Sequence, residues 1–359
     1  MDESSNAPSL ASQGAAQVCD STVLAIDVGG ANIKVADGLG WVTNQPFELW
    51  RHWQDLPTTL ANIIKAYSPR RIVATMTGEI ADCYPSRCAG VSHITASLQA
   101  AAQACDPHAE LGIYLLDGRI VSPAEAIAQP LAAAASNWHA VARLAAALTV
   151  TNRAMLIDIG STTTDIVVIR DGIPSPLASD DVGRMATGEL VYTGVERTPV
   201  AAIVRSLPLA GSRHPIASEL YAQSRDVWML LKGIPPNPDS HDTADGGPAT
   251  LAAARGRLAR MLLANPDSFS MTEAITAAEW CAKAQCRQVA GSLARVARSV
   301  GWQPTSVVLS GHGICLARRA LAALCWQVTI VSLSDSLGCD VSRAAPAHAL
   351  AMIARGILA

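Results

Sequence analysis

Two similar patterns of apolar and polar residues stand out along the chain. Residues 23–36 read Val-Leu-Ala-Ile-Asp-Val-Gly-Gly-Ala-Asn-Ile-Lys-Val-Ala, and residues 155–170 read Met-Leu-Ile-Asp-Ile-Gly-Ser-Thr-Thr-Thr-Asp-Ile-Val-Val-Ile-Arg. In each, two apolar runs rich in β-branched residues flank a short polar turn, as is typical of paired strands. The pattern therefore predicts two β-hairpins, each with a polar tip.

The segments after the first hairpin alternate between helical and strand patterns. Helical periodicity over residues 56–67 and 92–105 is separated by a β-type run at 71–76 and followed by strands at 111–116 and 119–121. Such alternation predicts an α/β layered domain.

The second half of the chain continues this alternation. The pattern predicts helices over residues 251–263, 272–300, 314–324 and 343–358, with strands at 305–309 and 327–331. A Pro- and Gly-rich stretch at 233–248 predicts a loop. We expect a tail over residues 1–20, a first domain over 21–150, a second over 151–342, and a C-terminal helix over 343–359 that packs back on the first domain.

Composition narrows the class of protein. The chain has 359 residues, of which 50% are hydrophobic and 16% charged, so it can bury two cores. A net charge of −3 without a basic run predicts neither nucleic-acid nor membrane binding. The alanine-rich segment 131–148 is interrupted by Asn137, His139 and Arg143, which predicts a buried helix and no membrane span. Nine Cys without a Cys-x-x-Cys pair predict reduced thiols, no zinc site and a cytoplasmic location.

The tip of the second hairpin carries groups that suit a phosphate and a metal ion. Asp158 ends the first strand, and Gly160 lets backbone N–H groups approach an anion. Ser161, Thr162 and Thr163 add hydroxyl donors. These residues therefore predict a phosphate-and-metal site.

The first hairpin repeats this layout in register. Asp27 corresponds to Asp158, and the remaining correspondences place Gly29, Gly30, Asn32 and Lys34 against Gly160, Ser161, Thr163 and Asp165. Two β-hairpins without any binding function would account for the glycines, but both hairpins also have an aspartate, Asp27 or Asp158, before the turn. The repeated acid favours a binding function at both tips.

The pair of tips resembles the two phosphate loops of the superfamily of acetate and sugar kinases, heat-shock chaperone ATPases and actin. A third element supports the resemblance: Ser-Val-Val-Leu-Ser-Gly-His-Gly at 306–313 is similar to the adenosine loop, with Gly311 and Gly313, although His312 stands where that superfamily has a small residue. The resemblance implies a two-domain actin-like ATPase (ribonuclease H-like) fold with a central interdomain cleft.

Three further blocks make the resemblance narrower. Residues 75–83, 188–199 and 243–247 are similar to a hydantoinase/oxoprolinase-like branch, which includes a synthase of methanofuran biosynthesis and bacterial relatives of the tetrahydromethanopterin-linked one-carbon pathway. The resemblance covers about residues 21–358. It implies substrate contacts by Glu189, Tyr192, Arg197, Thr198 and Asp245. Thr198-Pro199 would equally start a helix, and Asp245 would equally make an Asp-Gly turn.

The resemblance also implies a reaction. A phenol of the γ-glutamyltyramine type would displace diphosphate from an aminomethylfuran diphosphate, with Asp27 and Asp158 holding Mg²⁺ and Lys34 providing a point charge. A phenol with a pKa of about 10 needs a base. The candidates are Glu79, Asp82 and Asp158, while Glu79 and Asp82 would equally be ordinary surface acids.

Two other functions would use the same tips. One is an ATP-dependent hydantoinase- or oxoprolinase-like hydrolase or a small-molecule kinase, which requires a working adenosine site. The other is a non-catalytic nucleotide-binding accessory protein. In each case we expect small-molecule ligands, with a homodimer left open.

Overall fold

The computed structural model describes residues 19–149 and 151–358. The chain forms two compact units: unit 1 is Met1–Val150, Gly172–Pro174 and Val331–Ala359, and unit 2 is Thr151–Asp171 and Ser175–Ile330. The predicted tail over residues 1–20 lies outside the described residues except for Cys19 and Asp20, and Val150, beside the predicted domain boundary, also lies outside them.

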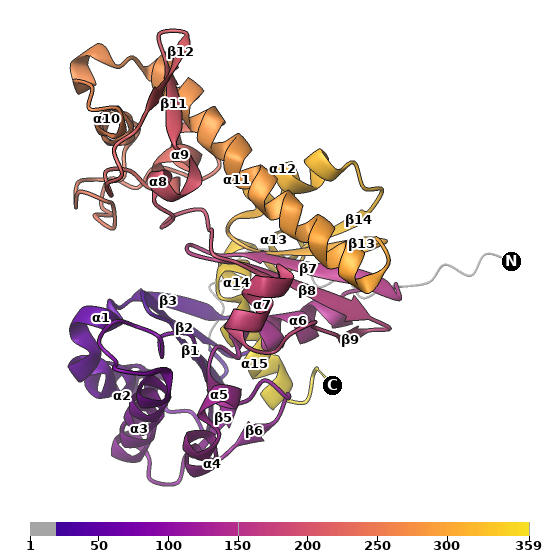
Figure 1. The fold of residues 1–359 in the computed structure, drawn as a ribbon. Helices are drawn as coiled ribbons and strands as arrows, with labels where there is room; N and C mark the ends of the chain where they lie inside the picture. Colours follow the sequence, from indigo (N-terminus) through magenta and orange to yellow (C-terminus); the bar gives the residue numbers. More distant parts are fainter. Residues whose placement is uncertain (1–18, 150, 359) are drawn as a thin grey trace, which may run out of the picture. The chain divides into compact units, whose positions relative to one another are not determined.

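Unit 1 is built on a six-stranded sheet with the order β3-β2-β1-β4-β5-β6 (Figure 1). β2 is antiparallel to both β1 and β3, β4 and β5 run parallel to β1, and β6 is antiparallel to β5. The strands are β1 (Val23–Val28), β2 (Asn32–Ala36), β3 (Val42–Pro46), β4 (Arg71–Met76), β5 (Glu110–Tyr114) and β6 (Ile120–Val121).

Helices cover the sheet of unit 1. Leu24, Ile26 and Val28 of β1 belong to one core with apolar side chains of α2 and α3, while α15 packs against β1, β2 and β4 and against α6. The helices are α1 (Leu49–His52), α2 (Leu56–Tyr67), α3 (Arg87–Cys105), α4 (Pro123–Ala128), α5 (Pro130–Ala133), α6 (Asn137–Ala147), α13 (Leu333–Leu337), α14 (Cys339–Arg343) and α15 (Ala345–Ala354), with a 3₁₀ turn η1 (Trp53–Asp55).

The sheet of unit 2 has the order β10-β8-β7-β13-β14. β7 and β8 form an antiparallel hairpin, and β13 runs parallel to β7. The strands are β7 (Arg153–Ile159), β8 (Thr164–Arg170), β10 (Leu190–Val191), β13 (Ser306–Gly311) and β14 (Thr329–Ser332), with a separate hairpin of β11 (Ser206–Leu209) and β12 (Ser212–Pro215). β9 (Ile173–Pro174) belongs to unit 1, where it packs on α6.

The long helix α11 (Met271–Val300) organises the rest of unit 2. Ser270 and Glu273 form a capping box at its start, and Gly301, with φ of +79°, ends it in the left-handed conformation. Its buried face packs on α9 and α12 (Figure 1). The other helices are α7 (Asp181–Thr187), α8 (Val200–Ile203), α9 (Ser224–Leu230), α10 (Leu251–Met261) and α12 (Ile314–Leu324), with a 3₁₀ turn η2 (Pro266–Ser268).

The predicted fold class is confirmed. Three antiparallel strands followed by two parallel crossover strands give unit 1 the ribonuclease H-like order, and unit 2 repeats its central hairpin with a parallel neighbour. None of the described helices is long and apolar enough to cross a membrane. The interdomain cleft stays a prediction.

Two predicted boundaries were wrong. The expected helix over 131–148 breaks into α5 and α6, because Ala135 has φ of +48° and the Ser136 hydroxyl bonds to the carbonyl oxygen of Tyr114. Residues 331–342, expected in the second domain, group with unit 1 because α14 packs on α15 and β3.

Candidate functional site

Both predicted hairpins form, and their turns share one hydrogen-bond pattern. In the first, Asp27 pairs with Lys34, and the Gly29 N–H donates to the Asn32 carbonyl oxygen over 2.9 Å. In the second, Asp158 pairs with Asp165, and the Gly160 N–H donates to the Thr163 carbonyl oxygen over 3.0 Å. We call residues 29–32 tip 1 and residues 160–163 tip 2. Their equivalent turns agree with the correspondence proposed from sequence.

Asp27 is a buried carboxylate beside tip 1. Its side chain is 1% exposed, and Oδ2 accepts a hydrogen bond from Lys34 Nζ at 3.3 Å. Among the described residues, Oδ1 has no hydrogen-bond partner. Burial raises the pKa of Asp27, and the neighbouring Lys34 ammonium opposes that rise. A cation bound at Oδ1 would relieve the cost of this buried charge.

The segment after β4 lies directly against tip 1. The N–H groups of Thr77 and Gly78 both donate to the Val28 carbonyl oxygen over 3.0 Å. A Cβ atom on Gly78 would collide with Leu49 and lie 3.1 Å from the Gly29 carbonyl oxygen. Glycine at position 78 therefore permits a close approach of the two backbones.

The structure separates the two acids of this segment. Glu79 is 1% exposed, and its Oε1 lies 3.5 Å from Arg87 Nε. The start of α3 packs on it, since a Cβ on Gly90 would collide with the Glu79 carbonyl oxygen. Asp82 is exposed. Glu79 thus reaches the surroundings of tip 1, whereas Asp82 stays on the surface; their catalytic roles stay predictions.

Tip 2 is held by the segment that follows β10. The N–H of Val195 donates to the Gly160 carbonyl oxygen at 3.1 Å, and those of Glu196 and Arg197 donate to the Ser161 carbonyl oxygen at 3.0 and 2.9 Å. A Cβ on Gly194 would lie 2.5 Å from Ser161 backbone atoms. The block at 188–199 therefore supports tip 2, and Arg197 is placed beside it.

The adenosine-like loop contacts the base of the second hairpin. Gly311 has φ of +79°, and a Cβ there would collide with the Ile159 carbonyl oxygen and lie 2.8 Å from Asp158 Oδ1. The Gly313 N–H donates to the same Ile159 oxygen at 3.0 Å. Asp158, tip 2 and the loop at 311–313 therefore form one candidate site within unit 2.

Two residues missed by the sequence analysis extend this site. Glu196 Oε1 lies 3.5 Å from His312 Nε2, and Glu196 Oε2 accepts a hydrogen bond from Arg225 Nη2 at 3.0 Å. Glu196 lies inside the recognised block, so its acidic side chain was a usable signal. Arg225 lies 29 residues away on α9, and no sequence motif marks it.

The carboxylate of Glu189 accepts hydrogen bonds from nearby residues of unit 2. It is 0% exposed and accepts hydrogen bonds from the N–H groups of Leu177 and Ala178 at 2.8 and 3.0 Å and from Thr187 Oγ1 at 3.1 Å. Burial raises its pKa against these hydrogen bonds. This geometry gives Glu189 a role in shaping the chain around α7, and its substrate contact stays a prediction.

Asp245 belongs to an ionic network. Its carboxylate accepts hydrogen bonds from Arg260 Nη1 at 2.7 Å and from Arg257 Nη1 at 3.0 Å, and Arg257 also pairs with the buried Asp226 at 2.7 Å. Partial burial works to raise the pKa of Asp245, but hydrogen bonds from Arg260, the Gly247 N–H and Arg257 lower it to about 2. Asp245 therefore stays ionised and anchors the loop before α10.

Tyr192 opens onto a cavity of about 470 Å³ in unit 2, which we call the arginine pocket. Tyr192 is 60% exposed. The pocket is lined by Met185, Leu190, Val191, Tyr192, Arg287, Gln288, Gly291, Ser292, Arg295 and Arg298. Of the predicted site residues, only Tyr192 lies there.

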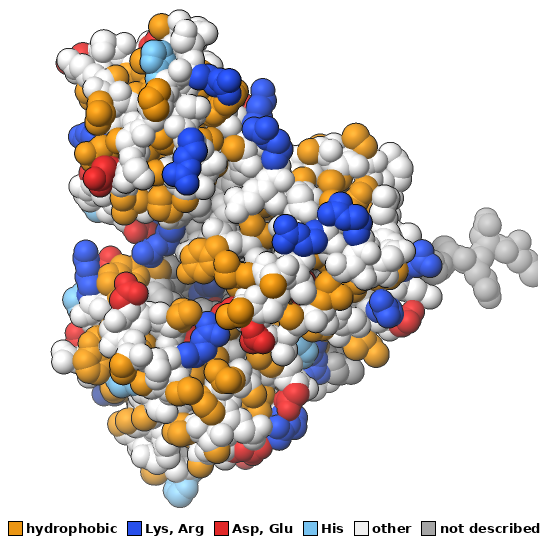
Figure 2. Space-filling view, in the orientation of Figure 1, with side chains coloured by type: hydrophobic (Ala, Val, Ile, Leu, Met, Phe, Trp, Pro, Cys, Tyr) orange, Lys and Arg blue, Asp and Glu red, His pale blue; other side chains and the backbone are white. Residues whose placement is uncertain are grey.

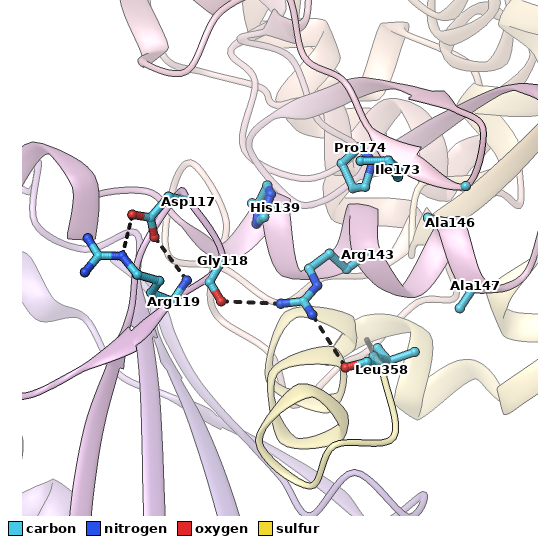
Figure 3. A pocket seen from close by; sticks show the side chains of 11 residues that line it. Asp117, Gly118, Arg119, His139, Arg143, Ala146, Ala147, Ile173, Pro174 and Leu358 are labelled. Carbon is cyan, nitrogen blue, oxygen red and sulfur yellow. Dashed lines mark hydrogen bonds and ion pairs between the residues drawn. The ribbon is translucent and has the colours of Figure 1, made fainter.

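A second cavity, of about 530 Å³, lies in unit 1 between α6, the turn at 117–119 and Leu358 (Figure 3). Arg143 donates to the carbonyl oxygens of Gly118 and Leu358 over 3.4 and 3.5 Å. On the same helix, burial lowers the pKa of His139 to about 4. None of the predicted site residues lines this cavity, and Arg143 links the C-terminal segment to the sheet.

Metal ligands are sparse in the parts of the chain that the structure describes. No group of three or more His, Cys, Asp or Glu side chains there could hold a metal ion. Magnesium usually keeps several waters and takes only one or two protein carboxylates, with substrate phosphates completing its shell. The unpartnered oxygen of Asp27 fits such a site.

The chain is similar to known proteins over most of its length. Residues 70–203 match the hydantoinase/oxoprolinase family model. The chain is 28% identical over 337 residues to the (4-{4-[2-(gamma-L-glutamylamino)ethyl]phenoxymethyl}furan-2-yl)methanamine synthase of Methanocaldococcus jannaschii, covering 92% of this chain and 97% of that protein. It is 28% identical to the synthase of the same name from Methanococcus vannielii, over 57% of this chain and 91% of that protein.

Solved structures resemble the chain more distantly. A ROK family glucokinase from Streptomyces griseus matches with a TM-score of 0.47 and 12% identity, over 93% of this chain and 99% of that one. An inorganic polyphosphate/ATP-glucomannokinase from Arthrobacter matches with a TM-score of 0.43 and 15% identity, over 93% and 98%. The family-model match and the two synthases confirm that this chain resembles the hydantoinase/oxoprolinase family, as inferred from its sequence.

Proposed function

We propose that this chain is a Mg²⁺-dependent transferase that joins an aminomethylfuran diphosphate to a phenolic acceptor and releases diphosphate. The similarity to two named synthases, which spans 92% of this chain in one of them, carries the proposal. The two acid-bearing tips support it, because a diphosphate leaving group needs N–H donors and cations around its oxygens.

The residues of tip 1 suit the departing group. Asp27 Oδ1 would hold Mg²⁺, which would supply positive charge to the diphosphate leaving group. Lys34, 27% exposed on β2, keeps a cation beside the same carboxylate. The Gly29 N–H closes the turn on the Asn32 carbonyl oxygen, so the N–H that would face an anion at this turn is that of Gly30.

The residues of tip 2 would bind phosphate oxygens within unit 2. The Gly160 N–H closes the turn on the Thr163 carbonyl oxygen, so Ser161, Thr162 and Thr163 would offer the backbone N–H and hydroxyl donors. Asp158 is our second candidate metal ligand. Because Asp165, opposite Asp158, pairs with Arg184 at 2.9 Å, the negative charge of that strand pair is partly balanced inside the unit.

The acceptor step transfers one proton. The phenol oxygen forms a bond to the furfuryl carbon, diphosphate leaves with the electrons of the broken bond, and the phenolic proton passes to a carboxylate base. Among the candidate bases, Asp158 lies at the base of the second hairpin, and Glu79 follows Gly78, which packs on tip 1, whereas Asp82 is exposed on the surface. We therefore favour Asp158 and Glu79 over Asp82.

A second candidate is an ATP-dependent hydrolase or kinase of the same superfamily. The observation that favours it is the glycine loop at 311–313, which folds against Asp158 as an adenosine loop would. His312 occupies the middle of that loop and lies 3.5 Å from Glu196. Cytoplasmic location, a homodimer and a nucleotide-binding accessory role stay open predictions.

Titration calorimetry with pyrophosphate and with ATP, each with and without Mg²⁺, distinguishes the candidates. We expect Mg²⁺-dependent pyrophosphate binding and product formation from the furan diphosphate and γ-glutamyltyramine without ATP. Asp158→Asn should abolish turnover, while Asp239→Asn, an exposed acid in a loop, should leave it unchanged. Turnover that requires ATP would contradict the transferase proposal and favour an ATP-dependent hydrolase or kinase.

A further inference from the structure

The arginine pocket presents one stripe of positive charge. Arg287, Gly291, Arg295 and Arg298 follow one another on α11 at spacings of four, four and three residues, so they share a face of the helix. All three arginines are exposed, and no Cβ contact would fill the space at Gly291. Figure 2 shows blue side chains on the surface that α11 covers.

These arginines have no acidic partner among the described residues. Arg287 Nε donates to the Lys283 carbonyl oxygen at 3.2 Å, and Arg295 Nη1 donates to the Ala186 carbonyl oxygen at 3.4 Å. By contrast, Arg319, on α12, forms a bidentate pair with Glu279. Like charges on one helix face repel each other, so this arrangement suits an anionic ligand.

The opposite wall of the pocket is apolar and aromatic. Leu190 and Val191 form β10, and the exposed side chains of Met185 and Tyr192 flank them, 51% and 60% exposed. An aromatic ring and a flexible thioether suit contact with a ring or an alkyl chain. The pocket thus joins an apolar surface to a cationic one.

The pocket adjoins tip 2 within the same unit. Val191 pairs with Thr164, the residue that follows tip 2, and Tyr192 comes directly after β10. Three residues further on, Val195 donates its N–H to the Gly160 carbonyl oxygen. A ligand that fills the pocket would therefore extend toward the groups that bind phosphate.

We propose that the arginine pocket binds the α-carboxylate of a γ-glutamyl phenolic acceptor and orients its phenol toward tip 2. This inference rests on the proposed function, in which the tips take the diphosphate and the acceptor brings a second anion. The product named for the two relatives carries a γ-glutamyl group, which has a free α-carboxylate and α-amino group. Gln288 and Ser292 provide oxygens for that ammonium, and Tyr192 contacts the phenyl ring.

A pair of acceptors that differ only in the carboxylate tests this inference. We would measure by calorimetry the binding of γ-glutamyltyramine and of 4-aminobutanoyl-tyramine to the full chain, and to its Arg295→Ala and Arg298→Ala variants. Lys283→Ala is the matched control, because it removes a positive charge from an exposed position of the same helix outside the pocket.

We expect the unmodified chain to prefer γ-glutamyltyramine at least tenfold, and each arginine variant to lose most of that preference without weakening the other acceptor. Lys283→Ala should keep it. Equal affinity for the two acceptors, or equal weakening of both in the variants, would overturn the inference. Pyrophosphate binding and turnover are measured separately, so turnover without carboxylate preference refutes only the pocket, whereas absent turnover with both acceptors refutes the proposed function.

Discussion

Replacing Gln285 by Leu should destabilise unit 2, because Gln285 joins three elements inside its core. The side chain is 0% exposed; Oε1 accepts a hydrogen bond from Trp228 Nε1 at 2.8 Å, and Nε2 donates to Thr193 Oγ1 at 2.8 Å and to the Gly194 carbonyl oxygen at 2.7 Å. Leu has a similar volume but no polar atom. The Trp228 N–H and the Gly194 oxygen would lose these partners while buried.

The magnitude follows from those two groups. Each buried donor or acceptor left without a partner costs about 1–3 kcal/mol, and a more apolar side chain returns roughly 1 kcal/mol. The free energy of unfolding should therefore fall by about 3 kcal/mol. Because Gly194 packs on Ser161 of tip 2, we also expect weaker pyrophosphate binding.

Urea unfolding followed by circular dichroism measures this loss. The matched control is Gln288→Leu, which replaces an exposed glutamine on the same helix and should change the free energy of unfolding by no more than about 0.5 kcal/mol. A Gln285→Leu variant within about 1 kcal/mol of the unmodified chain would refute the role given to this network.

Three further predictions concern the residues beside the two tips and the C-terminal helix α15. Gly311→Ala should reduce Mg-pyrophosphate binding at least tenfold in calorimetry, because its Cβ would displace Asp158 and strain a backbone with φ of +79°; unchanged binding would contradict this contact. Asp27→Asn should abolish Mg²⁺-dependent binding of pyrophosphate. It should also raise the urea midpoint of unfolding at pH 7, because burial raises the pKa of Asp27 and the stability tied to its protonated form is lost as pH rises. A lowered midpoint would show that the ion pair with Lys34 outweighs the desolvation of Asp27. Burial lowers the pKa of His348 to about 4, below its unfolded value near 6.5, so protons bind the unfolded chain more tightly. The free energy of unfolding should fall by up to about 3 kcal/mol between pH 7 and pH 4, and His348→Gln should flatten that dependence in pH-dependent melting curves; an equally steep dependence in the variant would assign it to other groups.

Local patterns predicted the hairpins and several helices well. The helix over residues 56–67 and the strand over 71–76 coincide with α2 and β4, because their apolar periodicity and end signals lie within the segments themselves. The correspondence between the two tips was also readable, since a strand pair with one short turn leaves a single register for its residues.

Partners from distant segments could not be predicted in the same way. Arg225 of α9 donates a hydrogen bond to Glu196. The three arginines of α11 line the same pocket as Tyr192, although these arginines come about one hundred residues later in the chain. Periodicity indicates which face of a helix is polar, but the packing of that helix decides what the polar face meets. The sequence alone therefore does not indicate what the arginines of α11 contact.

The two hairpins have the same backbone hydrogen-bond pattern but carry different charged side chains, and we infer different roles for them from this difference. In the first, the residue opposite Asp27 is Lys34, a partly exposed cation that can meet a diphosphate. In the second, the residue at the equivalent position is Asp165. Arg184 of α7, which is 1% exposed, forms an ion pair with Asp165. Anion binding at tip 2 would then use backbone N–H groups and hydroxyls, with Arg197 beside them. We therefore propose that the main metal and cation contacts of the leaving group lie at tip 1. Arg287, Arg295 and Arg298, which have no acidic partner among the described residues, would then serve the acceptor.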